Sequence, residues 1–169
     1  IYSDEGLLIG EFGAERRNVV NISDVPVHLK QAILAAEDDR FYEHGGVDYL
    51  GVLRAAYSNF SAGSVRQGAS TITMQVARNF FLTREKTLTR KFSEALLAFK
   101  IENNLSKDKI LELYVNQIYL GQRSYGFAAA AQTYFGKSLQ EINIAEAAML
   151  AGLPKAPSSY NPISNPKRA

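Results

Sequence analysis

The sequence predicts a mainly α-helical domain with a short β-hairpin at its N-terminus. Apolar residues recur at three- and four-residue spacing through most of the chain after Pro26, which is the period of one helix face. Before that point a short glycine-containing loop, Asp4-Glu5-Gly6, separates the segments 1–3 and 7–12, as in a hairpin. The 169 residues, 46% of them hydrophobic, suffice for one domain with a buried core. We therefore expect a single folded unit over 1–169.

The first predicted helix follows Pro26 and carries a carboxylate among apolar residues. Leu29, Ile33 and Phe41 share an i, i+4 row, and Glu37 occupies the remaining place in that row. Each later helix is identified by an apolar row and by its end signals: Leu50, Leu53, Tyr57 and Phe60 ahead of Gly63; Ile72, Val76 and Phe80 after a Ser70 cap; Leu88, Phe92, Ala95, Leu96 and Phe99; Leu111, Tyr114, Val115 and Ile118 between Ser106 and Gly121; 127–135 ahead of Gly136; and a last helix between the capping box Asn143–Glu146 and Gly152-Leu153-Pro154.

The tail is rich in proline, since four of the five prolines lie between Pro154 and Pro166. It is expected to be a linker or an arm wrapped on the core. The predicted organisation is thus a hairpin segment over 1–25, a helical core over 26–153 and a proline-rich tail over 154–169. The longest stretch without a charged residue has 13 residues, against the roughly 20 that a membrane-spanning helix needs. The absence of cysteine excludes disulfides and thiolate sites, and two histidines are too few for a histidine metal cluster.

Charge is distributed unevenly along the chain. Residues 1–65 hold five Lys/Arg against ten Asp/Glu, whereas residues 66–109 hold nine against four. A basic middle favours an anionic ligand such as a phosphate, a nucleic acid or a lipid headgroup, and the alternative is a solvated helix face. Nucleic acid is not expected, because the basic residues lack interleaved stacking aromatics and no helix-turn-helix pattern occurs.

Glu37 is the first candidate for chemistry. A carboxylate in an apolar row is desolvated, which raises its pKa and suits it to proton transfer. The acidic run that follows it closes on Gly45-Gly46, as expected for a helix end that lines a cleft. The alternative is a helix C-terminus with solvated acids, although acids at that end oppose the helix dipole.

Glu94 is the second candidate. It shares a row with Leu97, Ala98 and Ile101, separate from the main apolar stripe of its helix, so that helix is predicted to be apolar on two sides and central. Lys91 lies one turn before Glu94, and both side chains can face one cavity. The alternative is a structural i, i+3 ion pair.

Two further segments combine small, apolar or basic residues. Gly68-Ala69-Ser70-Thr71-Ile72-Thr73 leads into a helix N-terminus and is either an anion or sugar site or an ordinary serine cap. Phe80-Phe81-Leu82, followed by basic residues, suits a membrane interface or a buried helix end. His44 is expected to be a structural hydrogen bonder, and Asn116 lies on a polar row with Glu112 and Tyr119 that can support the site.

These segments, in this order, resemble the peptidoglycan glycosyltransferase domain of class A penicillin-binding proteins, glycosyltransferase family 51. The resemblance extends over nearly the whole chain. Where the family usually has two glutamines in its second motif, this chain has Met74 and Gln75. The family's five motifs are matched by 37–46, 68–75, 90–94, 109–121 and 146–154, the last continuing into Pro157 and Asn161-Pro162.

The resemblance implies a lysozyme-like helical head lobe with a smaller, membrane-associated jaw lobe. It also implies polymerisation of lipid II into β-1,4 glycan strands, with inversion at C1 and release of undecaprenyl pyrophosphate. The expected location is the outer face of the bacterial cytoplasmic membrane, and moenomycin is the expected inhibitor. Family members of this class carry an N-terminal transmembrane helix and a C-terminal transpeptidase domain, so the chain is expected to be one domain of a longer protein.

The resemblance also assigns roles to residues. Glu37 is expected to be the general base, and Lys91 the main contact of the leaving pyrophosphate. Glu94 is expected to assist the leaving group or to hold a divalent cation, Mg²⁺ or Mn²⁺, although nothing in the sequence requires a metal. The other expected substrate-binding residues are Asp38, His44, Ser70, Thr71, Gln75, Arg78, Arg84, Lys86, Arg90 and Asn116.

Two rival functions can be distinguished from this one. A muramidase or lytic transglycosylase also uses a catalytic glutamate on a lysozyme-like scaffold, but hydrolysis has no pyrophosphate for the basic middle to stabilise. A catalytically inactive scaffold that only binds glycan would not need Glu37 and Glu94, which are both present.

Overall fold

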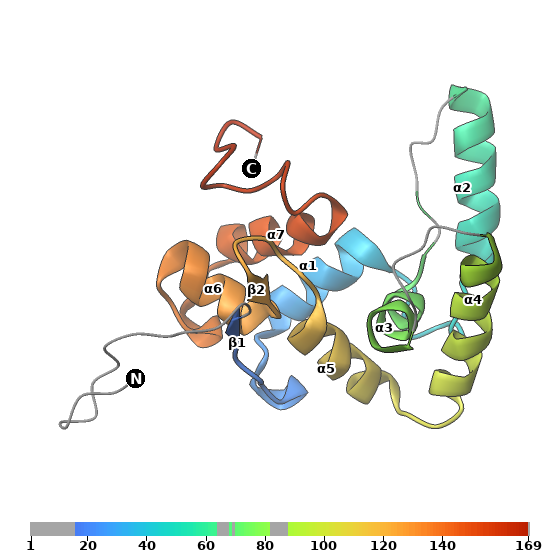
Figure 1. Ribbon diagram of the computed structural model, residues 1–169, viewed down its shortest axis with the longest axis horizontal. Helices are drawn as coiled ribbons and strands as arrows, with labels where there is room; N and C mark the ends of the chain where they lie inside the picture. The colour runs from blue at the N-terminus through green and yellow to red at the C-terminus, as the bar shows by residue number, and fades with distance from the viewer. Residues whose placement is uncertain (1–15, 64–67, 69, 82–87, 169) are drawn as a thin grey trace.

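The computed structural model describes residues 16–63, 68, 70–81 and 88–168, and within them the chain is mainly helical, as predicted (Figure 1). The predicted hairpin over 1–12 lies outside the described residues. Short 3-10 turns lie at Ile22–Asp24, Leu139–Glu141 and Leu153–Lys155. The other elements are β1 (Arg16–Arg17), α1 (Val27–Glu37), α2 (Tyr49–Ala62), α3 (Ile72–Phe81), α4 (Leu88–Glu102), α5 (Lys107–Gln117), β2 (Ser124–Tyr125), α6 (Phe127–Phe135) and α7 (Ile144–Gly152).

Most of the predicted helix ends are confirmed by capping contacts. The Ser106 side chain accepts a hydrogen bond from the Lys109 N–H, and Asn143 and Glu146 form a reciprocal capping box. Gly63 and Gly136 end their helices with φ of 61° and 65°, a left-handed conformation that favours glycine.

The predicted cap of α3 is wrong by one residue. The Oγ1 atom of Thr71, rather than a Ser70 oxygen, accepts the hydrogen bond of the Met74 N–H at 3.1 Å. Ser70 instead accepts a hydrogen bond from the Nζ atom of Lys91 at 2.5 Å. Sequence alone could not choose between two adjacent hydroxyls, because both residue types are good caps.

The two short strands pair in parallel and join distant parts of the chain. Arg16 lies opposite Ser124 and Arg17 opposite Tyr125. The segment after β1 is also held by Asn116, whose side chain accepts from the Val20 N–H and donates to the Val20 carbonyl. The beginning of the described chain is therefore attached to the far end of α5.

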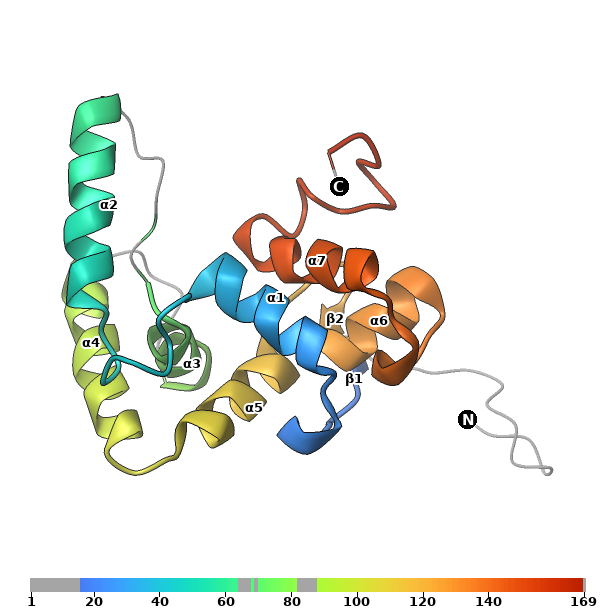
Figure 2. The ribbon, with the colours of Figure 1, turned by 180° about the vertical axis from the view of Figure 1, so that it is seen from behind.

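A hydrophobic core lies where α1, α5, α6 and α7 meet (Figure 2). α1 packs on α7, and α5 contacts α6 as well as the turn at Ile22–Asp24. The largest fully buried side chains of this core include Leu29, Phe41, Tyr114 and Phe127. The tail also contacts this part of the molecule, because Asn161 is buried and its Nδ2 atom lies 3.3 Å from the Tyr134 hydroxyl.

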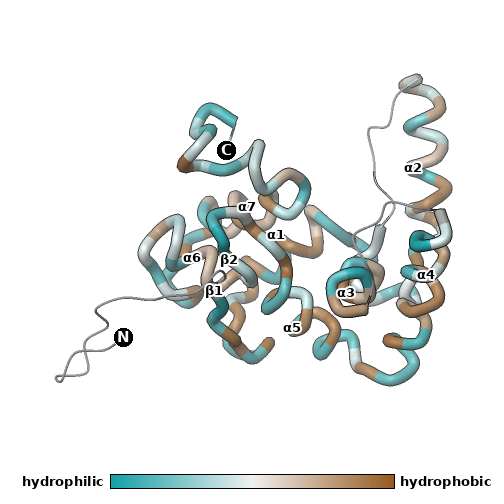
Figure 3. Tube along the Cα trace, in the orientation of Figure 1, coloured by the Kyte–Doolittle hydropathy of each residue, from teal (hydrophilic) through white to brown (hydrophobic). Residues whose placement is uncertain are grey.

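α2, α3 and α4 form a second group on the opposite side from α6 and α7 (Figures 1 and 2). α3 connects the two groups, since it packs against both α4 and α5. α2 extends away from the rest, and its predicted apolar row is exposed to solvent: Leu50, Leu53, Tyr57 and Phe60 are 59% to 89% exposed. Figure 3 shows hydrophobic positions along α2 and α4.

The prediction that α4 is a central helix, apolar on two buried sides, is wrong. Phe92 and Leu96 from its main apolar stripe are 67% and 55% exposed, whereas Glu94 and Ala98 are fully buried. The helix lies at the edge of the molecule and turns the Glu94–Ala98 side inward, with α3 packed against it. None of the described helices is long and apolar enough to cross a membrane.

Candidate active site

A cavity of about 510 Å³ lies where the end of α1, the following loop, the first half of α2 and the start of α3 come together. Lys155 from the turn after α7 closes one side. The cavity contains both acidic and basic groups, and its polar lining residues are Glu37, Asp38, Asp39, Asp48, Arg54, Ser70, Thr71, Gln75, Arg78 and Lys155.

Glu37 is the last residue of α1 and projects into this cavity. Its Oε2 atom accepts a hydrogen bond of 2.7 Å from the Nε2 atom of Gln75 on α3. Burial raises the pKa of the Glu37 carboxyl above its usual value, and the Gln75 hydrogen bond and Arg78 only partly oppose this effect. A carboxylate with a raised pKa beside an open cavity is suited to accept a proton near neutral pH. The predicted desolvation of Glu37 is confirmed.

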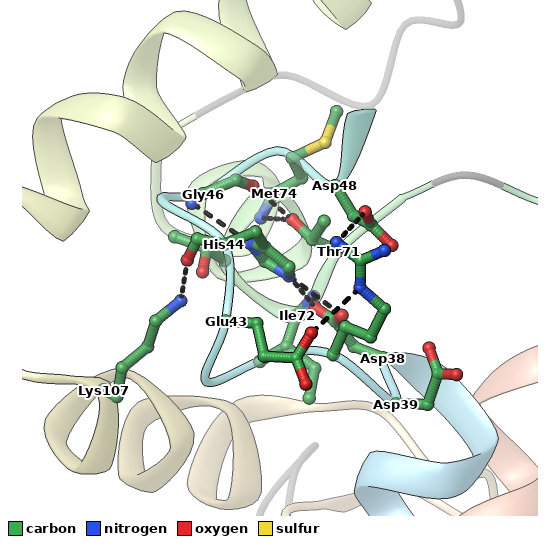
Figure 4. A network of polar contacts seen from close by, with 12 residues as sticks. Asp38, Asp39, Glu43, His44, Gly46, Asp48, Thr71, Ile72, Met74 and Lys107 are labelled. Atoms are coloured by element: carbon green, nitrogen blue, oxygen red, sulfur yellow. Dashed lines mark hydrogen bonds and ion pairs between the residues drawn. The ribbon is translucent and has the colours of Figure 1, made fainter. Parts of the chain in front are cut away.

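Asp38 and His44 bond to each other and to the backbone (Figure 4). The His44 Nε2 atom lies 2.9 Å from Oδ1 of Asp38, and its Nδ1 atom accepts from the Gly46 N–H. His44 thus donates from Nε2, so it is a structural hydrogen bonder, as predicted. The Oδ2 atom of Asp38 accepts from the Ile72 N–H at the start of α3. This pair therefore fixes the loop after α1 to α3.

The hydroxyl of Thr71 also makes its hydrogen bonds within the protein. It donates a 2.6 Å hydrogen bond to the carbonyl of Gly46 and accepts from the Met74 N–H. Met74, the departure from the family pattern, is itself buried. The start of α3 is consequently held in register with the loop that carries Asp38 and His44.

Lys91 and Glu94 do face one another, at 2.7 Å between Nζ and Oε2. Arg90 lies on the other oxygen, with its Nε atom 3.2 Å from Oε1 of Glu94. Glu94 is fully buried and does not line the cavity, and Lys91 does not line it either, although its ammonium donates to Ser70, which does. The predicted ion pair is therefore present, but the prediction that both side chains face the cavity is not confirmed, because neither Lys91 nor Glu94 lines it.

The surroundings of Glu94 do not fit a divalent cation. Each carboxylate oxygen already faces a positively charged side chain, and a metal ion there would meet like charge. Among the residues that the structure describes, no group of three or more His, Cys, Asp or Glu could hold a metal ion.

A family model described as transglycosylase matches residues 5–169 of the chain. The chain belongs to the transglycosylase family. It is 65% identical over all 169 residues to penicillin-binding protein 1A of Neisseria flavescens and, equally, of Neisseria gonorrhoeae. The crystal structure of penicillin-binding protein 1A from Haemophilus influenzae matches 99% of this chain with a TM-score of 0.50 and 35% identity. The predicted family and the predicted enzyme class, a glycosyltransferase, are thereby confirmed.

This transglycosylase domain spans 21% of the length of those Neisseria relatives and 15% of the chain in the Haemophilus structure. Penicillin-binding protein 1A is thus a much longer protein than the chain described by this sequence.

The transglycosylase cavity brings together some of the predicted substrate-binding residues and not others. Asp38, Ser70, Thr71, Gln75 and Arg78 line it. Asn116 does not, because its amide is occupied by the Val20 backbone and the Glu112 carbonyl. Arg84 and Lys86 lie outside the described residues.

Sequence reasoning missed Lys155 and Arg54, which both line the cavity. Arg54 lies near two carboxylates, with its NH1 atom 3.6 Å from Asp39 and its NH2 atom 3.9 Å from Asp48. Lys155 directly follows the motif that ends at Pro154, so a basic residue next to a family motif was the available signal. For Arg54 the only signal was its place in the first half of a helix beginning just after the acidic run.

Proposed function

We propose that this transglycosylase domain polymerises lipid II into β-1,4 glycan strands, with inversion at C1 and release of undecaprenyl pyrophosphate. The observation that carries the proposal is the desolvated Glu37 carboxylate, which opens on a cavity shared with Arg78 and Lys155. A base next to cationic groups is what the transfer of a sugar from a pyrophosphate requires.

In the proposed reaction the growing chain is the donor and lipid II is the acceptor. Glu37 accepts the proton of the acceptor's 4-hydroxyl while that oxygen forms a bond to C1 of the donor sugar. The bond between C1 and the pyrophosphate oxygen breaks, and the electron pair leaves with the pyrophosphate. Attack from the face opposite the leaving group converts the α-linkage into a β-linkage. Gln75 keeps the carboxylate directed into the cavity.

The leaving pyrophosphate is proposed to bind the positively charged side of the site. Lys91, which is 43% exposed at its side chain and bonded to Ser70, can meet an anion at the cavity without leaving Glu94. Buried Glu94 holds the ammonium group in place, which limits the entropy lost on binding. A Mg²⁺ or Mn²⁺ ion would be held by the pyrophosphate oxygens rather than by Glu94, and would neutralise their negative charge.

The proposed lipid-linked substrates also require a membrane surface, which we place at α2, the end of α3 and α4. Phe80 and Phe81 are 42% and 63% exposed, which favours a membrane interface over a buried helix end. The exposed apolar side chains of α2 and α4 continue this surface. Attachment to the outer face of the bacterial cytoplasmic membrane follows from the location of lipid II, and moenomycin is proposed to inhibit as a mimic of the donor.

A single assay tests the proposed reaction. Labelled lipid II incubated with the protein should yield glycan polymer and free undecaprenyl pyrophosphate, and Glu37→Gln should abolish both products. Glu43→Gln is the matched control, because Glu43 is an exposed carboxylate of the same loop that does not line the cavity. Release of small muropeptides from finished cell wall, with lipid II untouched, would instead identify a lytic enzyme. Binding of glycan without either reaction would identify an inactive scaffold.

A further inference from the structure

Lys107, the first residue of α5, makes three contacts beneath the loop that follows Glu37, and Figure 4 shows it beside His44. Its Nζ atom donates to the carbonyl of His44 at 2.6 Å and to Oε1 of Glu102 at 2.7 Å. The same ammonium lies 4.4 Å from the centre of the Phe41 ring. The side chain is 20% exposed and is absent from the cavity lining. Lys107 therefore acts on the loop and not on a ligand in the cavity.

Glu102, the partner of Lys107, is itself fixed from two sides. Thr73 on α3 donates a 2.6 Å hydrogen bond to the same Oε1 atom. Glu102 also packs under Gly46, where an added Cβ would lie 3.2 Å from the Glu102 Cγ atom and where φ is 100°. Residues from α3, α4 and α5 thus converge on a short stretch of loop around His44 and Gly46.

The loop connects these contacts to Glu37, the candidate base. His44 bonds to Asp38, and Asp38 bonds to the Ile72 N–H of α3. Asp38 directly follows Glu37, so the peptide bond that joins them is held by a chain of contacts beginning at Lys107. Gln75, which orients the Glu37 carboxylate, lies on the same α3 helix.

We propose that Lys107 is a positioning residue for the glycosyl transfer, which holds the Glu37 end of the loop in reactive geometry through His44 and Asp38. This inference rests on the proposed function. A displacement of about 1 Å in a catalytic group can lower a rate by about 100-fold. A residue that fixes the position of Glu37 can therefore affect the rate even though it touches no substrate. A purely structural lysine would lower the melting temperature and leave the turnover of the folded protein unchanged.

The test compares Lys107→Met, Lys107→Arg and Lys137→Met in the lipid II assay, each well below its own melting temperature. Methionine keeps the unbranched apolar stem of lysine but loses its donors and charge, whereas arginine keeps donors and charge. Lys137 is the matched control, because it forms a lysine–glutamate pair of 2.6 Å with Glu146, and neither residue lines the cavity.

We expect Lys107→Met to lower kcat at least about tenfold while KM changes less than about twofold, because lost positioning affects the reacting geometry and not the binding contacts. Lys107→Arg should recover most of kcat, and Lys137→Met should behave as the parent protein. Equal kcat values for Lys107→Met and Lys137→Met would overturn the proposal, and so would an effect on KM alone.

Hydrogen exchange supplies a readout that does not depend on activity. Peptides covering 38–48 should exchange faster in Lys107→Met than in the parent, whereas peptides from α6 and α7 should be unchanged. Uniformly faster exchange would indicate global destabilisation and contradict a local positioning role. If Lys107→Met does not fold, Lys107→Gln, which keeps a neutral NH₂ donor and loses the charge, should give a kcat below that of the parent, and an unchanged kcat overturns the inference. A parent protein that makes no polymer would refute the proposed function, while the exchange result would still stand by itself.

Discussion

The Nε2 atom of Gln75 donates a 2.7 Å hydrogen bond to Oε2 of Glu37, joining the middle of α3 to the last residue of α1. Both side chains line the cavity, and Gln75 is itself buried. The bond stabilises the charged form of a carboxylate that burial otherwise drives toward the neutral form. Gln75 therefore orients the candidate base and lowers its proton affinity, in opposition to the larger effect of burial.

Replacement of Gln75 by leucine should shift the pH–rate profile. Because the hydrogen bond lowers the Glu37 pKa, its removal raises that pKa further, and the acid limb of the profile moves to higher pH. On the acid limb, where less Glu37 is then ionised, the rate should fall about tenfold, as expected for a lost hydrogen bond to a charged group worth about 1.5 kcal/mol. Polymerisation measured across the pH range checks this expectation. An acid limb at the parent position would show that Gln75 does not act on Glu37.

Glu37→Gln should abolish polymerisation and yet stabilise the fold at neutral pH. Since the folded-state pKa of Glu37 is raised above the unfolded value, the native protein binds the proton more tightly. The stabilising contribution of protonated Glu37 is complete below the unfolded pKa, near 4.5, and is lost as pH rises through the folded pKa. In denaturant unfolding, the free energy of unfolding of the variant should therefore exceed that of the parent protein. This difference should widen as pH rises above 4.5 and close below it. A difference that does not change with pH would contradict this reasoning.

Lys91→Ala should lose polymerisation while the fold survives. Lys91 donates to a fully buried carboxylate, so its removal should also cost up to about 3 kcal/mol of stability, limited by Arg90, which remains beside Glu94. Loss of a pre-positioned cation for the leaving group should lower kcat by about 100-fold or more. Lys100→Ala, on an exposed face at the end of the same helix, is the control. Comparable rates for the two variants would remove Lys91 from the pyrophosphate site.

The turn before β2 offers a pair of stability predictions with opposite signs. Gly121 has φ of 87°, and an added Cβ would come within 2.7 Å of the Tyr134 hydroxyl and 2.9 Å of the Pro157 carbonyl. Gly121→Ala should therefore destabilise the protein by about 2 kcal/mol. Arg123 has φ of 60°, where a side chain is strained, so Arg123→Gly should stabilise by up to about 1 kcal/mol. Thermal or denaturant unfolding measures both, and a destabilised Arg123→Gly would mean that its side chain makes a compensating contact.

Much of the helical layout could be foreseen because its causes are local. The capping box at Asn143 and Glu146, the Ser106 cap and the left-handed Gly136 each depend on residues a few positions apart. Glu37 could be found for the same reason, since it follows buried Leu29 and Ile33 on one row of α1, although Phe41, the last member of the predicted row, lies in the turns beyond the helix. The i, i+3 spacing of Lys91 and Glu94 likewise predicted their contact.

Other features depend on which distant segment covers a surface. From the sequence, the apolar stripe of α4 and the Glu94–Ala98 row could equally well be buried. In the structure α3 packs against the Glu94–Ala98 row, which is therefore buried although it contains a charge. The apolar row of α2 is exposed for a similar reason, because no other described helix covers it extensively. Periodicity identifies an apolar face and does not say whether protein or another apolar environment meets it.

The amino-acid sequence alone was enough to predict the helices, the family motifs and Glu37 as the candidate base. Periodicity, caps and motif spacing depend only on residues that are close together in the chain. The folded chain was needed to show that Lys155 and Arg54 reach the same cavity as Glu37. It was also needed to show that Lys107 reaches the carbonyl of His44, 63 positions earlier in the chain. Such contacts arise from the way the helices pack, and helix packing is a property of long-range fit that no local pattern encodes.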